Sequence, residues 1–205
     1  MKQTIVTSLA KPVGNLWRNL QKEFINQGSF YVASPLSSTP LPIYEWIIKN
    51  AHTFSNWDKM KFVLMDEMLK GEKKPFTYVP ITDSASYEGF VRKHLLEPLR
   101  KKVKKNFQII KPEIDSIESF ETPLDLLILA LGIKGNYANA MPGTILENSW
   151  HIAHLIQEFR QVHTQKGSGS FDGANFREFG MSLGPQQVLH AKNIIVIISG
   201  EKNEN

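Results

Sequence analysis

Apolar side chains recur at helical spacing near the start of the chain. They lie three or four residues apart and are Val13, Leu16, Trp17, Leu20 and Phe24. Gly28 comes shortly afterwards, and a glycine just past the last periodic residue is typical of a helix end. The pattern therefore predicts an amphipathic helix. A short strand is predicted over the β-prone residues 29–33, before a turn rich in serine and proline.

The alternation of helix and strand continues along the chain. Helical patterns cover residues 43–52 and 86–99, and apolar runs typical of buried strands cover 60–66, 106–110, 124–132 and 193–200. Continuous apolar strands separated by helices indicate a parallel sheet. We therefore expect an α/β fold with a Rossmann-like, open, mainly parallel sheet covered by helices on both faces. Residues 71–80 are predicted to form a loop, and the start of 150–177 fits either a strand or a helix.

The composition fits one folded domain over residues 1–205. This length is enough to bury a full core, and 41% of the residues are hydrophobic while 21% are charged. No uncharged apolar run approaches the roughly 20 residues that cross a bilayer, so no membrane partner is expected. The first twelve residues lack the apolar region of a signal peptide, and the absence of cysteine excludes disulfides and thiolate sites. These features favour a cytoplasmic protein.

Positive charge is concentrated in one short segment. The net charge is +4 with a pI near 9.2, and the densest basic run lies between Arg100 and Lys105. Cations complement the negative dipole at the end of a helix, and no aromatic side chains alternate with these lysines as base stacking would require. We interpret the run as a solvated helix end and expect no nucleic-acid partner.

Polar residues with chemical potential follow three of the predicted strands. Ligands of open parallel sheets bind beyond the carboxyl ends of the strands, where this sequence places residues 37–40, the pair Asp66 and Glu67, and the loop 132–144. The hydroxyl-rich turn ahead of a helix suits a phosphate, although Ser38 or Thr39 as a helix cap would give the same pattern. The acidic pair Asp66 and Glu67 could include a base for proton transfer, but an acidic pair in a solvated loop would give the same pattern.

Five short segments carry a resemblance when they are taken in order. They comprise Ser37, Ser38, Thr39 and Pro40 followed by Tyr44; Met65, Asp66, Glu67 and Met68; Ser86, Tyr87 and Phe90; Lys134, Gly135, Asn136 and Ala138 with Met141, Pro142 and Gly143; and Gly184, Leu189, Ala191 and Lys202. Together these segments resemble the motifs of the glucosamine-6-phosphate deaminase (isomerase) and 6-phosphogluconolactonase family. The resemblance covers most of the chain and identifies a divergent member.

The resemblance implies an enzyme that acts on a phosphorylated sugar. It places Asp66 as the base that moves a proton between sugar carbons, without a cofactor or a metal, and it is compatible with a homo-oligomer. The catalytic candidates are Asp66, Glu67, Asn136 and Glu147. The candidates for binding the sugar phosphate are Ser37, Ser38, Thr39, Lys134, Gly135 and Arg177.

The third loop departs from the family pattern. Lys134 and Asn136 stand where the family has an Asp and a His for ring opening or lactone hydrolysis, and Met141 replaces the deaminase Glu. Neither an amide nor a thioether shuttles protons near neutral pH. Substitutes are available downstream in Glu147, His151 and His154, and Lys134 fits either a base or a group that attracts an anion. Three functions remain open: a sugar-phosphate isomerase or deaminase, a non-catalytic sugar-phosphate-binding pseudoenzyme, and a 6-phosphogluconolactonase-like hydrolase.

Overall fold

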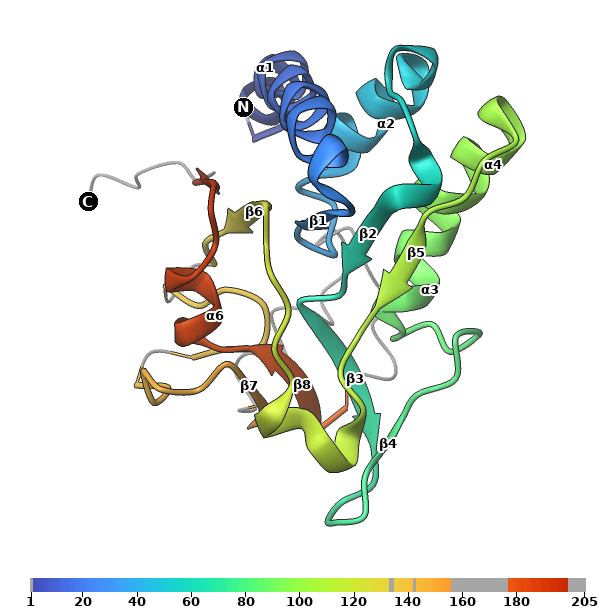
Figure 1. The fold of residues 1–205 in the computed structure, drawn as a ribbon. Helices are drawn as coiled ribbons and strands as arrows, with labels where there is room; N and C mark the ends of the chain where they lie inside the picture. The colour runs from blue at the N-terminus through green and yellow to red at the C-terminus, as the bar shows by residue number, and fades with distance from the viewer. Residues whose placement is uncertain (1, 133–134, 142, 156–176, 199–205) are drawn as a thin grey trace, which may run out of the picture.

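Helices and strands alternate along the chain in the computed structural model, which describes residues 2–132, 135–141, 143–155 and 177–198 (Figure 1). The helices are α1 (Lys2–Phe24), α2 (Leu41–Lys49), α3 (Tyr87–Val91), α4 (Glu97–Val103) and α6 (Pro185–Leu189). The strands are β1 (Phe30–Ala33), β2 (Met60–Val63), β3 (Asp66–Lys70), β4 (Thr77–Tyr78), β5 (Gln108–Ile110), β6 (Leu126–Ala130), β7 (Trp150–His154), β8 (Phe179–Leu183) and β9 (Ile194–Ile197). A π-helical turn over Arg92–Leu96 joins α3 to α4.

Within these residues, β1, β2, β5, β6 and β9 form a parallel sheet in the order β5-β2-β1-β6-β9. The register pairs Phe30 of β1 with Met60 of β2 and Val32 with Leu126 of β6. Because all five strands run in the same direction, the loops that follow β1, β2 and β6 leave from one edge of the sheet. All three polar segments therefore begin at the same edge, as the sequence predicts, while their assembly into one site stays a prediction.

The expectation of a single open sheet is wrong in one respect. An antiparallel sheet in the order β4-β3-β8-β7 adjoins the carboxyl edge of the parallel sheet, which Figure 1 shows as the strands below the arrowhead of β2. The apolar run 60–66 is interrupted after Val63, and the chain enters the new sheet at Asp66. Part of the predicted loop 71–80 is strand β4, and the ambiguous segment at Trp150 is strand β7.

Helix α1 packs closely on helix α2. A side-chain carbon on Gly14 would come within 2.1 Å of the Trp46 ring, so glycine at this position allows the close approach. Trp17 of α1 and Ile43 and Tyr44 of α2 are fully buried. They belong to a continuous apolar cluster that extends to Ile197 of β9 and includes residues of both sheets. The assignment of residues 1–205 to one domain stays a prediction.

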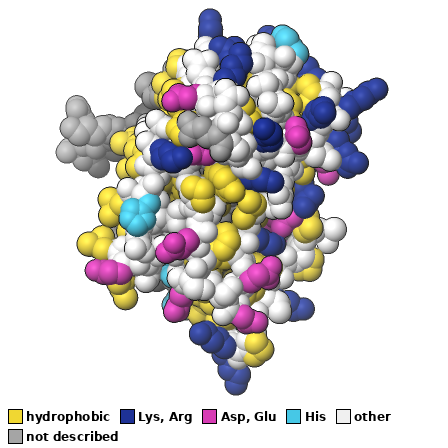
Figure 2. Space-filling model, in the orientation of Figure 1, with side chains coloured by type: hydrophobic (Ala, Val, Ile, Leu, Met, Phe, Trp, Pro, Cys, Tyr) yellow, Lys and Arg dark blue, Asp and Glu magenta, His cyan; other side chains and the backbone are white. Residues whose placement is uncertain are grey.

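The basic run between Arg100 and Lys105 lies where helix α4 ends. Three of its cations are in the last turn of the helix, and Lys104 takes the left-handed conformation (φ 53°) that closes it. Figure 2 shows Lys and Arg side chains gathered on the surface over this region, at the upper right of the view. This placement supports the interpretation as a solvated helix end. In the part of the chain that is described, no helix combines the length and the apolar character needed to cross a membrane.

Candidate active site

The loop between β1 and α2 presents hydroxyl groups at the start of a helix. Ser37, Ser38 and Thr39 are partly exposed, and the backbone N–H of Thr39 donates to Oγ of Ser37 at 3.4 Å. The N-cap position is taken by Pro40, which has no polar side chain. Backbone N–H groups at a helix start attract anions because of the helix dipole. At the start of α2, however, the N–H groups of Leu41 and Ile43 already donate to the carbonyl oxygens of Ser38 and Pro40. Phosphate binding by the hydroxyl residues of this loop stays a prediction.

Tyr44 ties this loop to the centre of the site. Its ring is fully buried in α2, and its hydroxyl donates to the carbonyl oxygen of Pro35 at 3.0 Å. Burial raises the pKa of Tyr44, and the nearby charge of Asp66 raises it further. Tyr44 therefore connects Pro35, which precedes the hydroxyl residues, with the surroundings of Asp66.

Asp66 opens strand β3 directly beyond the carboxyl edge of the parallel sheet. The residue is 5% exposed, and its Oδ1 is buried without a hydrogen-bond partner among the described residues. Burial raises the pKa of the carboxyl well above its ordinary value, and the charge of Glu67 raises it further. An unpaired, buried carboxyl of raised pKa is the state expected of a general base at a binding site.

Glu67 lies next in the chain but points away from Asp66, because successive side chains of a strand alternate between its faces. Its Oε1 accepts from the N–H groups of Met68 at 2.9 Å and Tyr87 at 2.8 Å. Its Oε2 accepts from the N–H of Glu88 at 2.8 Å and the hydroxyl of Ser86 at 3.1 Å. Both carboxylate oxygens therefore accept hydrogen bonds from the start of α3, and these contacts were not predicted from the sequence.

Described residues of the third loop contact the end of strand β6 and strand β8. The backbone N–H of Gly132 donates to the carbonyl of Asn136 at 2.8 Å, so Asn136 lies at the carboxyl edge with Asp66. Asn139, which the sequence did not mark, is fully buried and donates through Nδ2 to the carbonyl of Met181 at 3.1 Å. Gly135 is exposed with φ 76°. Lys134, predicted to bind the phosphate, lies outside the described residues.

The three downstream acid–base candidates differ in their positions. Glu147 is exposed, and His154 is an exposed partner of Glu178 at 2.9 Å. His151 is half-buried, and its Nδ1 has no partner among the residues described. The register pairs His151 with Ser182 and Ser182 with Asp66, so these three side chains share one face of the antiparallel sheet. Burial lowers the pKa of His151, which favours its neutral form.

Arg177, predicted to bind the phosphate, has an internal partner. Its Nη2 donates to Oδ2 of Asp83 at 2.7 Å. Arg177 lies just before strand β8. The first pair of the β3–β8 ladder on that side is Leu69 with Phe179, and it lies three positions along the ladder from the pair of Asp66 with Ser182. The role of Arg177 at the phosphate stays a prediction.

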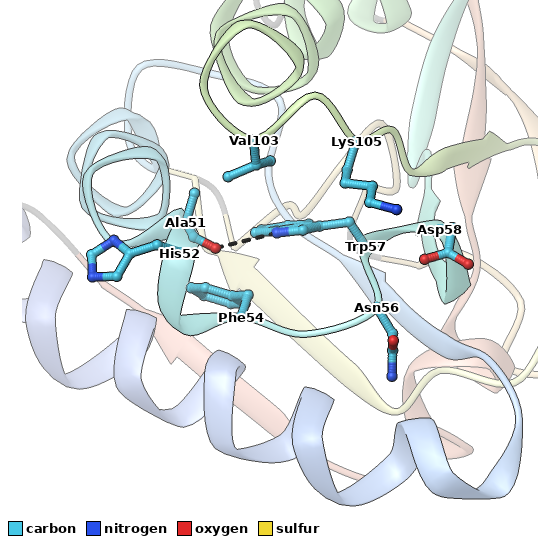
Figure 3. Close-up of a pocket in the computed structure, with 8 residues that line it drawn as sticks. All are labelled: Ala51, His52, Phe54, Asn56, Trp57, Asp58, Val103 and Lys105. Atoms are coloured by element: carbon cyan, nitrogen blue, oxygen red, sulfur yellow. Dashed lines mark hydrogen bonds between the residues drawn. The ribbon is translucent and has the colours of Figure 1, made fainter.

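A second pocket lies at the opposite edge of the parallel sheet, near the start of β2. It has a volume of about 220 Å³ and is lined by Ala51, His52, Phe54, Asn56, Trp57, Asp58, Val103 and Lys105 (Figure 3). Phe54 and Trp57 stack with ring centroids 4.8 Å apart, and the indole N–H donates to the carbonyl of Ala51. This pocket lies away from Asp66. In the portion of the chain described, no group of three acidic or histidine side chains is arranged to hold a metal ion.

Sequence comparison finds similar proteins whose names describe deaminases. No family model matches the sequence. AgaI of Escherichia coli (strain K12), whose name proposes a deaminase activity, is 24% identical over 177 residues, which are 82% of this chain and 65% of AgaI. Glucosamine-6-phosphate deaminase of Lactococcus lactis subsp. cremoris (strain SK11) is 28% identical over 201 residues, 92% of this chain and 77% of that protein. The chain thus spans slightly less than two thirds of AgaI.

Solved structures share the fold. A monomeric glucosamine-6-phosphate deaminase, described as a missing link of the NagB superfamily, superposes on this chain with a TM-score of 0.75 at 17% sequence identity. The superposition covers 95% of this chain and 79% of the deaminase chain. The 6-phosphogluconolactonase of Trypanosoma brucei gives a TM-score of 0.64 at 14% identity, with the same shares covered. These likenesses concern the arrangement of helices and strands.

Proposed function

The chain is a distant member of the NagB superfamily of glucosamine-6-phosphate deaminases and 6-phosphogluconolactonases, and from this premise we propose that it transfers a proton between neighbouring carbons of a phosphorylated sugar. The substrate class is a hexosamine or hexose 6-phosphate. Asp66 is the base. Ser37, Ser38 and Thr39 bind the phosphate at the start of α2.

The state of Asp66 is the observation that carries the proposal. Removing a proton from carbon requires a carboxylate that is more basic than one in water and that is not already paired. Burial supplies the basicity, and the unpaired Oδ1 leaves one oxygen available for the substrate. In the open-chain sugar, Asp66 takes the proton from C2, beside the C1 aldehyde. The electrons of the broken C–H bond form a C1–C2 double bond while the π electrons of the aldehyde move onto O1, which gives an enediolate from a hexose or an aminoenolate from a hexosamine. When the proton is returned to C1, the double bond moves to C2 and its oxygen or nitrogen, and the proton that this atom loses passes to O1, which leaves a C2 ketone or imine.

A non-catalytic binding protein is the second candidate, and a specific observation favours it. The third loop reaches the site but brings the amide of Asn136 and the half-buried thioether of Met141, neither of which transfers protons. Hydrolysis of a lactone is less well supported, because it would require a proton-accepting group at the position of Asn136.

Deuterium exchange separates these functions. Wild-type protein in D2O with a hexosamine 6-phosphate is expected to exchange the C2 proton, followed by NMR. Asp66→Asn is expected to lower the exchange rate by about 10²–10⁴-fold while ligand binding persists, because the amide keeps the shape but not the basicity. Asp58→Asn, an exposed acid of the second pocket, is the matched control and should exchange normally.

A binding measurement runs beside the exchange assay. The phosphorylated sugar at 100 times its dissociation constant should add about 2.7 kcal/mol to the free energy of unfolding, and the unphosphorylated sugar should add little. Unchanged exchange in Asp66→Asn would eliminate Asp66 as the base. Stabilisation without exchange in wild type would support the binding protein instead.

A further inference from the structure

Glu67 is a buried acid that the proposed reaction does not use directly. It is fully inaccessible, it follows Asp66 in the chain, and four donors surround its carboxyl group. Three of these donors are the backbone N–H groups of Met68, Tyr87 and Glu88. A carboxyl group with this number of short contacts cannot move to accept a proton from a substrate. Its function must therefore be exerted through a neighbour.

We propose that Glu67 is a positioning residue for Asp66: as a buried anion it fixes the corner where the chain enters β3, and its negative charge makes Asp66 a stronger base. This inference rests on the proposed function, in which Asp66 removes the proton. It replaces the interpretation of Glu67 as a group that itself transfers protons.

The contacts of Glu67 indicate the ionised form. A carboxylate offers only acceptor sites, so it can satisfy all four donors, whereas a protonated carboxyl group would turn one hydrogen toward a donor. Burial is the largest influence on the pKa of Glu67 and holds it above its ordinary value, although the N–H groups of Glu88, Tyr87 and Met68 and the charge of Lys111 lower it. The first N–H groups of a helix also favour an anion. The proposal therefore takes the ionised form of Glu67 from its four donors.

The charge of Glu67 acts on Asp66 with little screening. Both side chains are buried, and charges in the interior interact more strongly than charges in water. The other titratable groups associated with Asp66 are Tyr44 on α2 and Tyr87 on α3, whose pKa values burial raises, so both are neutral. His151, two strands away on the same sheet face, is kept neutral by burial.

Two cations near α3 share one carboxylate. Lys111 pairs with Glu88 at 2.8 Å and Arg92 pairs with the same carboxylate at 2.6 Å. Within the described residues, burial and the charge of Glu67 are the causes that raise the pKa of Asp66. Removing that charge should therefore make Asp66 ionise at lower pH, without removing Asp66 itself.

The test compares two variants by the pH dependence of C2 deuterium exchange. Glu67→Gln removes the charge, so the acidic limb of the profile should move to lower pH. At a pH below the limb, the rate relative to each protein's own plateau should rise about tenfold for each pH unit that the limb moves. Ser86→Ala is the matched control, because it removes one donor to Glu67 and the cap to Gly89 but leaves the charge.

Ser86→Ala should lose stability and keep the limb in place. A limb that stays fixed in Glu67→Gln, or that moves equally in Ser86→Ala, would overturn the proposal. A second measurement needs neither variant nor turnover: carboxyl-carbon NMR titration of the unaltered protein. Glu67 should ionise at lower pH than Asp66, and the reverse order would overturn the proposal even if Glu67→Gln fails to fold. Absence of exchange in wild type would reject the proposed function without affecting this titration.

Discussion

Asp66→Asn is expected to stabilise the folded protein at neutral pH while it removes the base. The carboxyl group is 5% exposed, and its Oδ1 has no partner among the described residues. A buried carboxylate without a partner costs free energy that a neutral amide of the same shape does not. The same feature that makes Asp66 reactive therefore makes it a cost to folding.

The sign and size of the effect follow from proton linkage. In the unfolded chain Asp66 ionises near its ordinary pKa of about 3.9, while burial and the charge of Glu67 raise its pKa in the folded state. Between these two pKa values the folded state holds a proton that the unfolded state has released, so wild-type stability falls as pH rises. The loss is about 1.4 kcal/mol per pH unit and stops above the folded pKa.

Asparagine does not titrate, so the difference in the free energy of unfolding between Asp66→Asn and wild type reports the ionisation of Asp66 alone. The advantage of Asp66→Asn should be smallest below pH of about 4, grow by about 1.4 kcal/mol per pH unit, and then level off. Urea unfolding of both proteins across closely spaced pH values measures it, and each kcal/mol should also raise Tm by about 2–4 °C at this size. A difference that is independent of pH, or that shrinks as pH rises, would refute the argument.

Two further substitutions test the walls of the site. Gly180→Ala would place a carbon 2.5 Å from Nδ2 of Asn139, so it should break the bond to Met181, cost about 1–3 kcal/mol in urea unfolding, and slow exchange by displacing the third loop. Tyr44→Phe leaves the carbonyl of Pro35 without its donor, so it should cost about 1–3 kcal/mol and weaken binding of the sugar phosphate in calorimetry. Normal exchange in Gly180→Ala would show that Gly180 does not support the site. Normal affinity in Tyr44→Phe would show the same for Tyr44.

The parallel sheet could be predicted from the sequence because its central strands are apolar on both faces. Strand β6 is a continuous run of Leu, Ile and Ala, and it lies between β1 and β9 as a buried strand must. The antiparallel sheet gave weaker signals. Strand β3 begins with two acidic residues, β8 contains Gly180, and β4 has only two residues. The acidic start of β3, the glycine in β8 and the short length of β4 each weaken the strand signal in the sequence.

The positions of the candidate residues were predictable from the sequence, but their contacts with distant residues were not. The place of Asp66 at the sheet edge was predictable because the residue directly follows an apolar run. The partners of Glu67 lie about twenty positions away, and Asp83, the partner of Arg177, lies 94 positions away, so neither contact leaves a local signal. Asn139 is a polar loop residue by sequence, and only its approach to Gly180 explains its burial.

The location of Asp66 at the junction of the two sheets separates two parts of the proposed chemistry. The junction supplies burial and the charge of Glu67, and both depend on β3 and α3 rather than on the third loop. The groups that the family resemblance assigns to ring opening lie in that loop, where this chain has Asn136 and Met141. The presence of Asn136 and Met141 in the loop therefore leaves the burial of Asp66 and the charge of Glu67 in place. Since C2 exchange requires the base and an open-chain sugar, but no release of product, it reports on Asp66 even where ring opening by the protein is slow.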